Sequence, residues 1–274
     1  MWKEFQEKYK INSSVIKVID EDMKFDKITK VQNVVIPNFL KNRDVIVKSC
    51  TGSGKTLAYL IPIFQRLIQE IKNEYIDNDD NKNNKYQNEN GNGEIAVENI
   101  LEIKNKILAL IILPTRELAM QVKTILLKFI EKIKFSYALL IGGKKLEKDL
   151  NRLKEDIPNI IVATPGRIFD LDEKLNFNYR DLKVLVLDEA DKMLELGYEV
   201  KLTYLFGKFP KQRRTGLFSA TINSQIENMI KVGMQNPIFV DIKINLDTEK
   251  VQKVQKTPEK IETEQEHLNL NKNI

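Results

Sequence analysis

Between about residues 43 and 240, short apolar runs alternate with amphipathic helical stretches such as Leu57–Ile71 and Glu117–Ile130. The runs carry Ile, Val and Leu at consecutive positions, which is typical of strands buried on both faces. We expect strands at Val45–Val47, Ile107–Leu113, Tyr137–Ile141, Ile160–Ala163, Val184–Leu187 and Gly216–Ser219. This repetition predicts an α/β fold, in which helices cover both faces of a mostly parallel sheet. Ligands of such folds bind at the carboxyl ends of the strands.

Two polar segments lie outside this alternation. Residues 77–93 consist almost wholly of Asn, Asp, Lys, Glu, Gln and Gly, and they bury too little apolar surface to offset the entropy lost on ordering. We therefore expect a disordered insertion there. The chain becomes rich in Lys, Glu, Gln and Asn again from about residue 246. We expect one domain over residues 1–245, followed over 246–274 by a linker or the start of another domain.

The composition excludes several classes of protein. Cys50 is the only cysteine and His267 the only histidine, so the chain can form neither an internal disulfide nor a His/Cys metal cluster. The longest apolar run, Ile107–Leu113, is far shorter than the ~20 residues that span a membrane. Residues 1–10 lack the apolar core of a signal peptide. We expect a soluble intracellular protein. Its net charge of +5 is compatible with a polyanionic partner but is weak evidence for one.

A phosphate-binding loop follows the first expected strand. Its residues are Ser49, Cys50, Thr51, Gly52, Ser53, Gly54, Lys55 and Thr56. This spacing matches the P-loop, with Ser49 where the general pattern has its first glycine. The glycines allow the backbone to approach a polyphosphate, Lys55 can reach the terminal phosphates, and the Thr56 hydroxyl suits Mg²⁺. An accidental glycine-rich turn is the alternative, but a strand before and a helix after favour the P-loop.

An acidic quartet, Asp188–Asp191, ends the expected strand Val184–Leu187. Carboxylates at the end of a buried strand are costly unless a cation or a hydrated site receives them. In a P-loop protein Asp188 would help to hold Mg²⁺, and Glu189 would orient and deprotonate an attacking water. The alternative is that the quartet caps the following helix. We expect the tips of neighbouring strands to bring Lys55 and the quartet together, so Lys55, Asp188 and Glu189 are the predicted catalytic residues.

The quartet reads Asp-Glu-Ala-Asp and resembles the name motif of the DEAD-box RNA helicases. Other stretches resemble motifs of that family in the same order: Phe25–Gln32, Pro114–Ala119, Gly142–Gly143, Thr164–Arg167 and Ser219–Thr221. The likeness covers about residues 2–242 apart from the polar insertion, and the ordered set is specific where single motifs are not. It implies a RecA-like domain that uses ATP and Mg²⁺.

The family's adenine-reading Q motif corresponds to residues 5–33. By resemblance, Gln32 pairs with the adenine edge, as a side-chain amide can do bidentately, and Phe25 stacks on the base. Lys24 and Ile28 replace the family's usual Gly and Pro.

The resemblance also implies an RNA-binding surface that grips the backbone without reading its sequence. Its residues are Pro114, Thr115, Arg116, Gly142, Gly143, Thr164, Pro165, Gly166 and Arg167. Thr164 and Pro165 have the pattern of an N-cap followed by proline at the first helical position, which leaves backbone amides free for a phosphate. Taken singly, each segment is equally well explained as a capped helix start or a tight turn.

The same resemblance suggests that Ser219 and Thr221 hydrogen-bond Asp191 and so link the nucleotide state to the RNA-bound conformation. The alternative is a structural pair of hydroxyls. The tip of the strand ending at Ser219 is expected beside that of the acidic strand.

The resemblance implies an ATP-dependent RNA helicase that works with a second RecA-like domain in cis. After residue 242 the sequence has no second P-loop-like half and no His-Arg-x-Gly-Arg stretch. Because arginine fingers contribute about 10³–10⁵ to phosphoryl-transfer rates, the isolated chain should hydrolyse ATP poorly. The alternative is a non-catalytic module that binds ATP and RNA. We expect a monomer.

Three stretches, Val35–Val45, Pro210–Thr221 and Gln255–Pro258, are similar to one subgroup of the family. That subgroup acts in the nucleolus on assembly of the large (60S) ribosomal subunit. The similarity implies a role in ribosome biogenesis and rRNA processing, with pre-ribosomal RNA as partner and the nucleolus as location.

Overall fold

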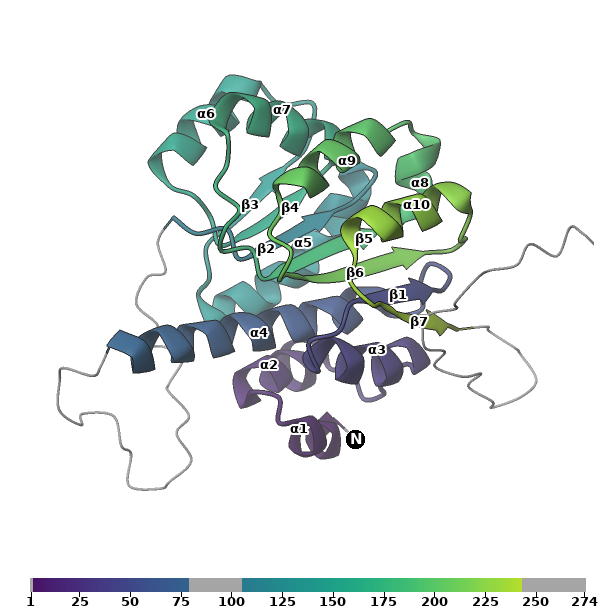
Figure 1. The fold of residues 1–274 in the computed structure, drawn as a ribbon. Helices are drawn as coiled ribbons and strands as arrows, with labels where there is room; N and C mark the ends of the chain where they lie inside the picture. Colours follow the sequence, from purple (N-terminus) through teal and green to yellow (C-terminus); the bar gives the residue numbers. More distant parts are fainter. Residues whose placement is uncertain (1, 79–104, 243–274) are drawn as a thin grey trace, which may run out of the picture.

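The computed structural model describes residues 2–78 and 105–242 (Figure 1). These residues form a seven-stranded sheet in the order β3-β4-β2-β5-β6-β1-β7, and every strand pairing is parallel. The strands are β1 (Val45–Lys48), β2 (Ala109–Ile112), β3 (Tyr137–Leu140), β4 (Ile160–Ala163), β5 (Val184–Asp188), β6 (Arg214–Ser219) and β7 (Ile238–Asp241). The predicted α/β class with a parallel sheet is confirmed.

Each predicted strand has an observed counterpart, but β7 was not predicted. It pairs with β1 at the edge of the sheet. Its burial alternates, since Ile238 and Val240 are buried whereas Phe239 and Asp241 are partly exposed. Its apolar run Ile238–Val240 is as long as the run Val45–Val47 from which β1 was predicted, so the sequence did carry a signal for this strand.

Helices cover both faces of the sheet (Figure 1). One face is covered by α1 (Trp2–Tyr9), α2 (Ser13–Lys17), the π-helix η1 (Val18–Met23), α3 (Lys30–Leu40), α4 (Lys55–Asn78) and α5 (Arg116–Ile133). The opposite face is covered by α6 (Leu146–Glu155), α7 (Pro165–Leu175), α8 (Ala190–Glu195), α9 (Glu199–Lys208) and α10 (Ser224–Gly233).

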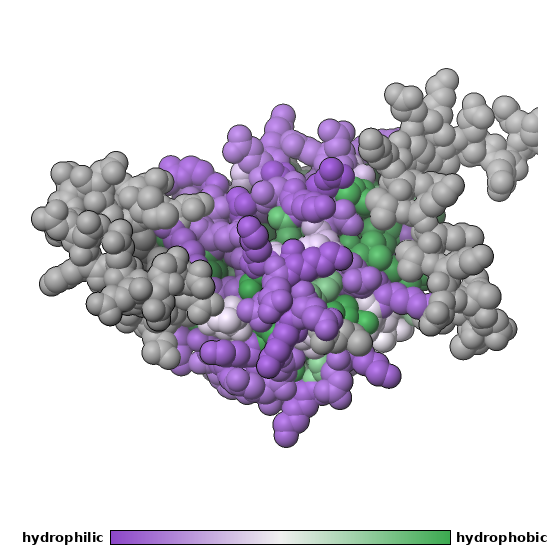
Figure 2. Space-filling model, turned by 90° about the horizontal axis from the view of Figure 1, so that it is seen from below, coloured by the Kyte–Doolittle hydropathy of each residue, from purple (hydrophilic) through white to green (hydrophobic). Residues whose placement is uncertain are grey.

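The sheet separates two hydrophobic cores. Alternate residues of β2 serve them in turn: Ala109 and Ile111 belong to the core under α4, and Leu110 and Ile112 to the core under α9. This follows from the two-residue period of a strand. The first core also includes Trp2 and Phe5 of α1, which are almost fully buried. Seen from the side of α1 to α4, the surface is largely hydrophilic, with apolar residues in separate patches (Figure 2).

Two predicted segments fall mostly outside the described residues. The polar insertion lies there from residue 79, because α4 continues to Asn78, and the segment from residue 246 lies there entirely. Within residues 2–78 and 105–242, no helix combines the length and the apolar character needed to cross a bilayer.

The parallel arrangement brings the carboxyl ends of all strands to one edge of the sheet. The expectation that the strands carrying the phosphate loop and the acidic quartet are neighbours is wrong, because β6 lies between β1 and β5. In register, Lys48 is opposite Ser219, and Asp188 is opposite Phe218. The three tips are therefore level, so the loop after β1 and the quartet after β5 lie at the same edge of the sheet.

Candidate active site and adjoining groove

The phosphate loop joins the tip of β1 to the start of α4. Its first residue is anchored to the next strand, since the Ser49 amide donates to the Ser219 carbonyl at 3.0 Å. Gly52 and Gly54 have φ of +78° and +93°, in the left-handed region that favours glycine. Around Gly52 an added Cβ would meet nothing within 4 Å. Cys50 and Thr51 are exposed and Ser53 is partly exposed, so one side of the loop is open to a ligand.

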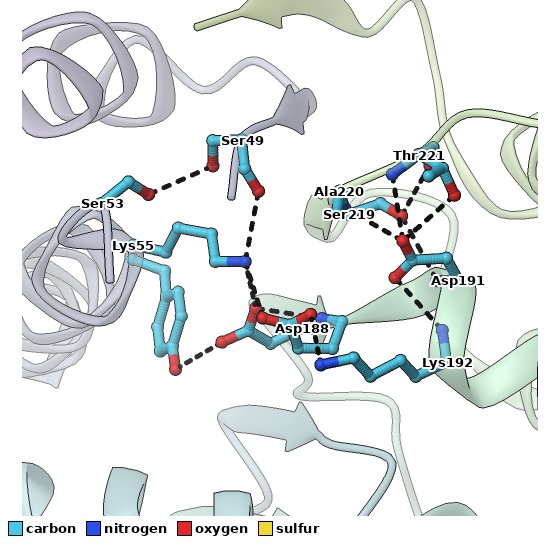
Figure 3. Close-up of polar contacts among 11 residues, drawn as sticks. Ser49, Ser53, Lys55, Asp188, Asp191, Lys192, Ser219, Ala220 and Thr221 are labelled. Atoms are coloured by element: carbon cyan, nitrogen blue, oxygen red, sulfur yellow. Dashed lines mark hydrogen bonds and ion pairs between the residues drawn. The ribbon is translucent and has the colours of Figure 1, made fainter. Parts of the chain in front are cut away.

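Lys55 joins the phosphate loop to the acidic quartet (Figure 3). Its side chain is 5% exposed, and its Nζ lies 2.8 Å from Glu189 Oε1 and 3.8 Å from Asp188 Oδ1. The same ammonium donates to the Ser49 carbonyl at 3.5 Å. The structure therefore brings the three predicted catalytic residues together.

Asp188 is held by hydrogen bonds on both of its carboxylate oxygens. Oδ1 accepts from the Glu189 amide at 3.0 Å, and Oδ2 accepts from the Tyr59 hydroxyl at 3.2 Å. Burial raises the pKa of Asp188 to about 6, the Lys55 charge opposes this rise, and the Glu189 charge adds to it. Burial and the Asp188 charge also raise the pKa of Tyr59 well above its ordinary value, so its hydroxyl stays protonated.

Glu189 occupies an unusual backbone conformation between β5 and α8. Its φ of +56° is left-handed, which is costly for a residue with a side chain and is often found at functional sites. Its Oε2 is buried without a hydrogen bond and lies 3.3 Å from Lys192 Nζ. Two carboxylates and one lysine therefore lie together in a buried space. Burying these charges costs free energy unless further ionic or hydrogen-bonding groups bind to them.

The residues at this edge fit a magnesium ion bound together with phosphates. Within residues 2–78 and 105–242, no group of three or more His, Cys, Asp or Glu side chains could hold a metal ion. Mg²⁺ usually takes one or two carboxylates and completes its shell with phosphate and water oxygens. Asp188 supplies a carboxylate, and Thr56, partly exposed in the first turn of α4, supplies a hydroxyl. The glycine-lined loop beside them leaves room for phosphates.

The Q-motif residues pack against the phosphate loop. Thr29 caps α3, and Gln32 completes a capping box by accepting from the Thr29 amide at 2.9 Å. The other end of the Gln32 amide donates to the Gly54 carbonyl at 3.2 Å. Gln32 is therefore a link between α3 and the loop. Phe25 is 49% exposed and free to stack, and Lys24 before it has φ +55°, which explains why a glycine suits that position.

A groove adjoins this edge of the sheet and contains most of the predicted RNA-binding residues. It is lined by Pro114, Thr115, Arg116, Glu117, Gly142, Thr164, Gly166, Arg167, Asp170 and Tyr198. Thr115 caps α5 through a bond from the Leu118 amide at 3.3 Å. Thr164 precedes α7 and Pro165 begins it, as predicted, although the Thr164 side chain makes no capping bond. Two helix N-termini therefore open beside one groove.

Arg116 and Arg167 both contact the turn at residues 141–144, but in different ways. Exposed Arg116 lies directly against it, so that a Cβ on Gly143 would overlap its guanidinium, and Gly143 has φ +90°. Arg167 is 7% exposed and donates to the carbonyls of Ile141, at 3.1 Å, and Lys144. Its Nε also lies 3.0 Å from Asp149 Oδ2. Arg116 is available to an anion in the groove, whereas the Arg167 guanidinium braces the turn from within.

Asp191 connects α8 to the segment that follows β6 (Figure 3). Its Oδ2 accepts from the amides of Ala220 and Thr221, at 3.1 and 3.0 Å, and from the Thr221 hydroxyl at 3.1 Å. The Ser219 hydroxyl accepts from the Asp191 amide at 3.3 Å and donates to the Thr221 carbonyl at 2.7 Å. Both suggested contacts with Asp191 are therefore present. Thr221 bonds the carboxylate of Asp191, whereas Ser219 bonds its backbone amide.

Several residues of this region were not predicted. Tyr59 lies one helical turn after Thr56, so the i, i+3 spacing of the helix could have found it. Asp170 and Tyr198 line the groove from α7 and from the turn before α9, and no sequence pattern links them to it.

Comparisons with known proteins agree with this geometry. The family model described as "DEAD/DEAH box helicase" matches residues 29–229. The chain is 40% identical over 230 residues to "ATP-dependent RNA helicase DDX55" of Gallus gallus, covering 81% of this chain and 34% of that protein. It is 36% identical over 221 residues to "DEAD-box ATP-dependent RNA helicase 18" of Oryza sativa subsp. japonica, covering 80% and 30%. The chain thus spans about a third of the length of these relatives.

A solved structure of a DEAD box protein from Methanococcus jannaschii superposes with a TM-score of 0.68 at 30% sequence identity. The superposition covers 87% of this chain and 56% of the other. A hypothetical ATP-dependent RNA helicase from Sulfolobus tokodaii gives 0.64 at 28% identity, covering 84% and 57%. The family match over residues 29–229, with the fold and the strand-tip geometry, shows that this chain belongs to the DEAD/DEAH box helicases.

Proposed function

We propose that this chain is the first RecA-like domain, over residues 1–245, of an ATP-dependent RNA helicase. The observation that carries the proposal is the 2.8 Å contact between Lys55 of the phosphate loop and Glu189 of the acidic quartet. This contact supports the proposal because it joins a P-loop lysine to a buried acidic pair at the carboxyl ends of the strands, where ligands of α/β folds bind.

The nucleotide would be held by the loop Ser49–Thr56 and the Q motif. Backbone amides at the start of α4 and the Lys55 ammonium would bind the phosphates. Phe25 and Gln32 are proposed to contact the adenine. Phe25 has the exposed ring that stacking requires. Gln32 lies beside the loop, and it would pair with adenine by exchanging its present bonds to the Thr29 amide and the Gly54 carbonyl for the base.

Hydrolysis would depend on the two buried carboxylates. Asp188 and the Thr56 hydroxyl would hold Mg²⁺, which neutralises phosphate charge when bound. Glu189 Oε2 would accept a proton from the attacking water, because it is buried and makes no hydrogen bond of its own. Lys55, which pairs with Glu189 and lies near Asp188 in this structure, would share its charge with the phosphates.

RNA would lie in the groove described above and be held through its backbone. The proposed contacts are Pro114, Thr115, Arg116, Gly142, Gly143, Thr164, Pro165 and Gly166. Arg167, whose guanidinium is buried against the turn, would hold that turn in place for RNA. Free amides at two helix N-termini and the exposed Arg116 suit phosphate oxygens. Asp191, Ser219 and Thr221 would link this groove to the nucleotide site.

Duplex unwinding would require a second RecA-like domain in cis. We propose this because the relatives are about three times as long as the matched region, and because an arginine from another domain is a common source of phosphoryl-transfer catalysis. The similarity of residues 35–45 and 210–221 to one subgroup supports a role in large-subunit ribosome biogenesis, with pre-ribosomal RNA as substrate and the nucleolus as location.

The test is RNA-stimulated ATP hydrolysis by this chain, compared with Glu189→Gln. We expect slow hydrolysis that single-stranded RNA accelerates and that the substitution abolishes, with ATP binding retained. Equal, near-zero rates for both proteins, together with intact ATP and RNA binding, would instead indicate a non-catalytic binding module. Absence of ATP binding would contradict both functions.

A further inference from the structure

Tyr59 lies inside the core under α4, but its hydroxyl points to the tip of the acidic strand. It belongs to α4, one turn after Thr56, and its side chain is fully buried. Its hydroxyl donates to Asp188 Oδ2 at 3.2 Å. The residues are 129 positions apart in the sequence, so the bond joins the helix that carries the phosphate loop to the tip of β5.

The ring of Tyr59 is held in place from the strand between. Phe218 of β6 contacts it edge-on, with centroids 5.3 Å apart and planes at 64°. The register places Phe218 opposite Asp188. A phenylalanine would fill the same core volume without a polar atom, so packing alone does not account for the hydroxyl. A buried hydroxyl costs free energy unless it has a partner, and the partner here is a carboxylate of the proposed magnesium site.

We propose that Tyr59 is a positioning residue for Asp188. Its hydroxyl fixes Oδ2 and thereby sets the plane of the carboxylate, which leaves Oδ1 beside the Glu189 amide and Lys55 Nζ. Residues that orient a metal ligand in this way commonly affect metal affinity without touching the metal. The inference rests on the proposed function, because it assigns Tyr59 to the magnesium requirement of the same nucleotide site.

The test is Tyr59→Phe, which removes only the hydroxyl. Binding of a fluorescent ADP is titrated with Mg²⁺, and ADP affinity is also measured in EDTA. We expect the Mg²⁺ midpoint to rise about tenfold, as is typical for loss of an outer-shell partner, with the affinity in EDTA unchanged. Tyr179→Phe is the matched control, since Tyr179 is a second buried tyrosine, 2% exposed, in the opposite core. Its Mg²⁺ midpoint should equal that of the unsubstituted chain.

A second comparison asks whether Tyr59 acts through Asp188. Combined with Asp188→Asn, Tyr59→Phe should weaken Mg²⁺-dependent ADP binding no further than Asp188→Asn alone, because the group that the hydroxyl positions has lost its charge. Additive effects would overturn the proposal. So would an unchanged Mg²⁺ midpoint in Tyr59→Phe, or an equal loss of affinity with and without Mg²⁺. If the unsubstituted chain itself shows no Mg²⁺-dependent ADP binding, the proposed function fails together with this inference.

Discussion

Gly54 is constrained twice, by its backbone conformation and by its neighbours. Its φ is +93°, and an added Cβ would lie 2.8 Å from both Gln32 Nε2 and Thr29 Oγ1. We therefore expect Gly54→Ala to push the Q motif away from the phosphate loop, lowering stability by about 1–3 kcal/mol and nucleotide affinity at least about tenfold. Urea unfolding and equilibrium ADP binding measure the two effects.

Gly52→Ala is the matched control for that substitution. Gly52 also has a left-handed φ, +78°, but no atom would meet its Cβ within 4 Å. Only the conformational cost remains, about 1 kcal/mol. If Gly52→Ala and Gly54→Ala reduced stability equally, contact with Gln32 and Thr29 would not be the reason that Gly54 is required.

The chemistry of individual residues was predictable where phosphate binding dictates the residue type. Gly54 and Lys55 belong to this kind, because the loop needs a tight backbone and a cation. The environment of Arg167 was not predictable. Its buried guanidinium donates to the Ile141 carbonyl, 26 positions away in the sequence. No local sequence pattern indicates such a contact.

The junction between β6 and α8 depends on one carboxylate oxygen with three donors. Thr221→Val removes the hydroxyl donor and leaves both backbone amides in place. We expect stability to fall by only about 1 kcal/mol and ATP affinity to stay unchanged. RNA stimulation of ATP hydrolysis should fall, because Asp191 would be less firmly tied to the segment after β6.

Thr124→Val provides the comparison for this element. Thr124 is exposed on α5, and its hydroxyl bonds the Met120 carbonyl at 3.0 Å, away from the nucleotide site. RNA stimulation should be normal in that variant. A Thr221→Val protein with reduced stability but full RNA stimulation would show that the hydroxyl at residue 221 has a structural role only.

The N-terminal helices can be held to the rest of the domain by apolar packing or by ion pairs. The expected contributions to stability favour packing. Lys132 lies 2.7 Å from Glu21, but these side chains are 33% and 57% exposed, so the ion pair contributes at most about 1 kcal/mol. Phe5 is 6% exposed and belongs to the core under α4. We expect Phe5→Ala to cost about 3 kcal/mol. Urea unfolding of Lys132→Ala and Phe5→Ala compares them, and equal losses would contradict this ranking.

Elements were predictable where they are long or buried on both faces. The central strands satisfy this condition, and so do the helices around Leu57–Ile71 and Glu117–Ile130. The helices before residue 24 are five to eight residues long. Such short helices show too few periods for a pattern to be distinguished, and they are fixed by packing on the rest of the chain.

At the scale of the whole molecule, the sequence predicted that the phosphate loop and the acidic quartet share one edge of the sheet and that the strand ending at Ser219 lies beside the acidic strand, but not that β6 separates β1 from β5. Parallel strands must end at one edge, so the phosphate loop and the acidic quartet had to share it. Pairing of β6 with both β1 and β5 is a long-range choice between segments of similar composition. Because of that choice, the tip of β6 lies between the tip that leads into the phosphate loop and the tip that leads into the acidic quartet.

The whole groove, more than any single residue in it, determines the expected response of RNA binding to salt. If helix N-termini and Arg116 hold the backbone, log affinity should fall linearly with log salt, with a slope of about −0.7 for each phosphate neutralised. Arg116→Ala should make that slope shallower by about one phosphate and weaken all single-stranded sequences alike. Arg180→Ala, which changes an exposed arginine outside the groove, should leave the slope unchanged.

Fluorescence anisotropy with two unrelated RNA oligonucleotides between 50 and 200 mM salt, a range of about fourfold, measures both the affinity and its slope with salt. An affinity that ignores salt, or an Arg116→Ala effect confined to one sequence, would mean that bases and not the backbone are read.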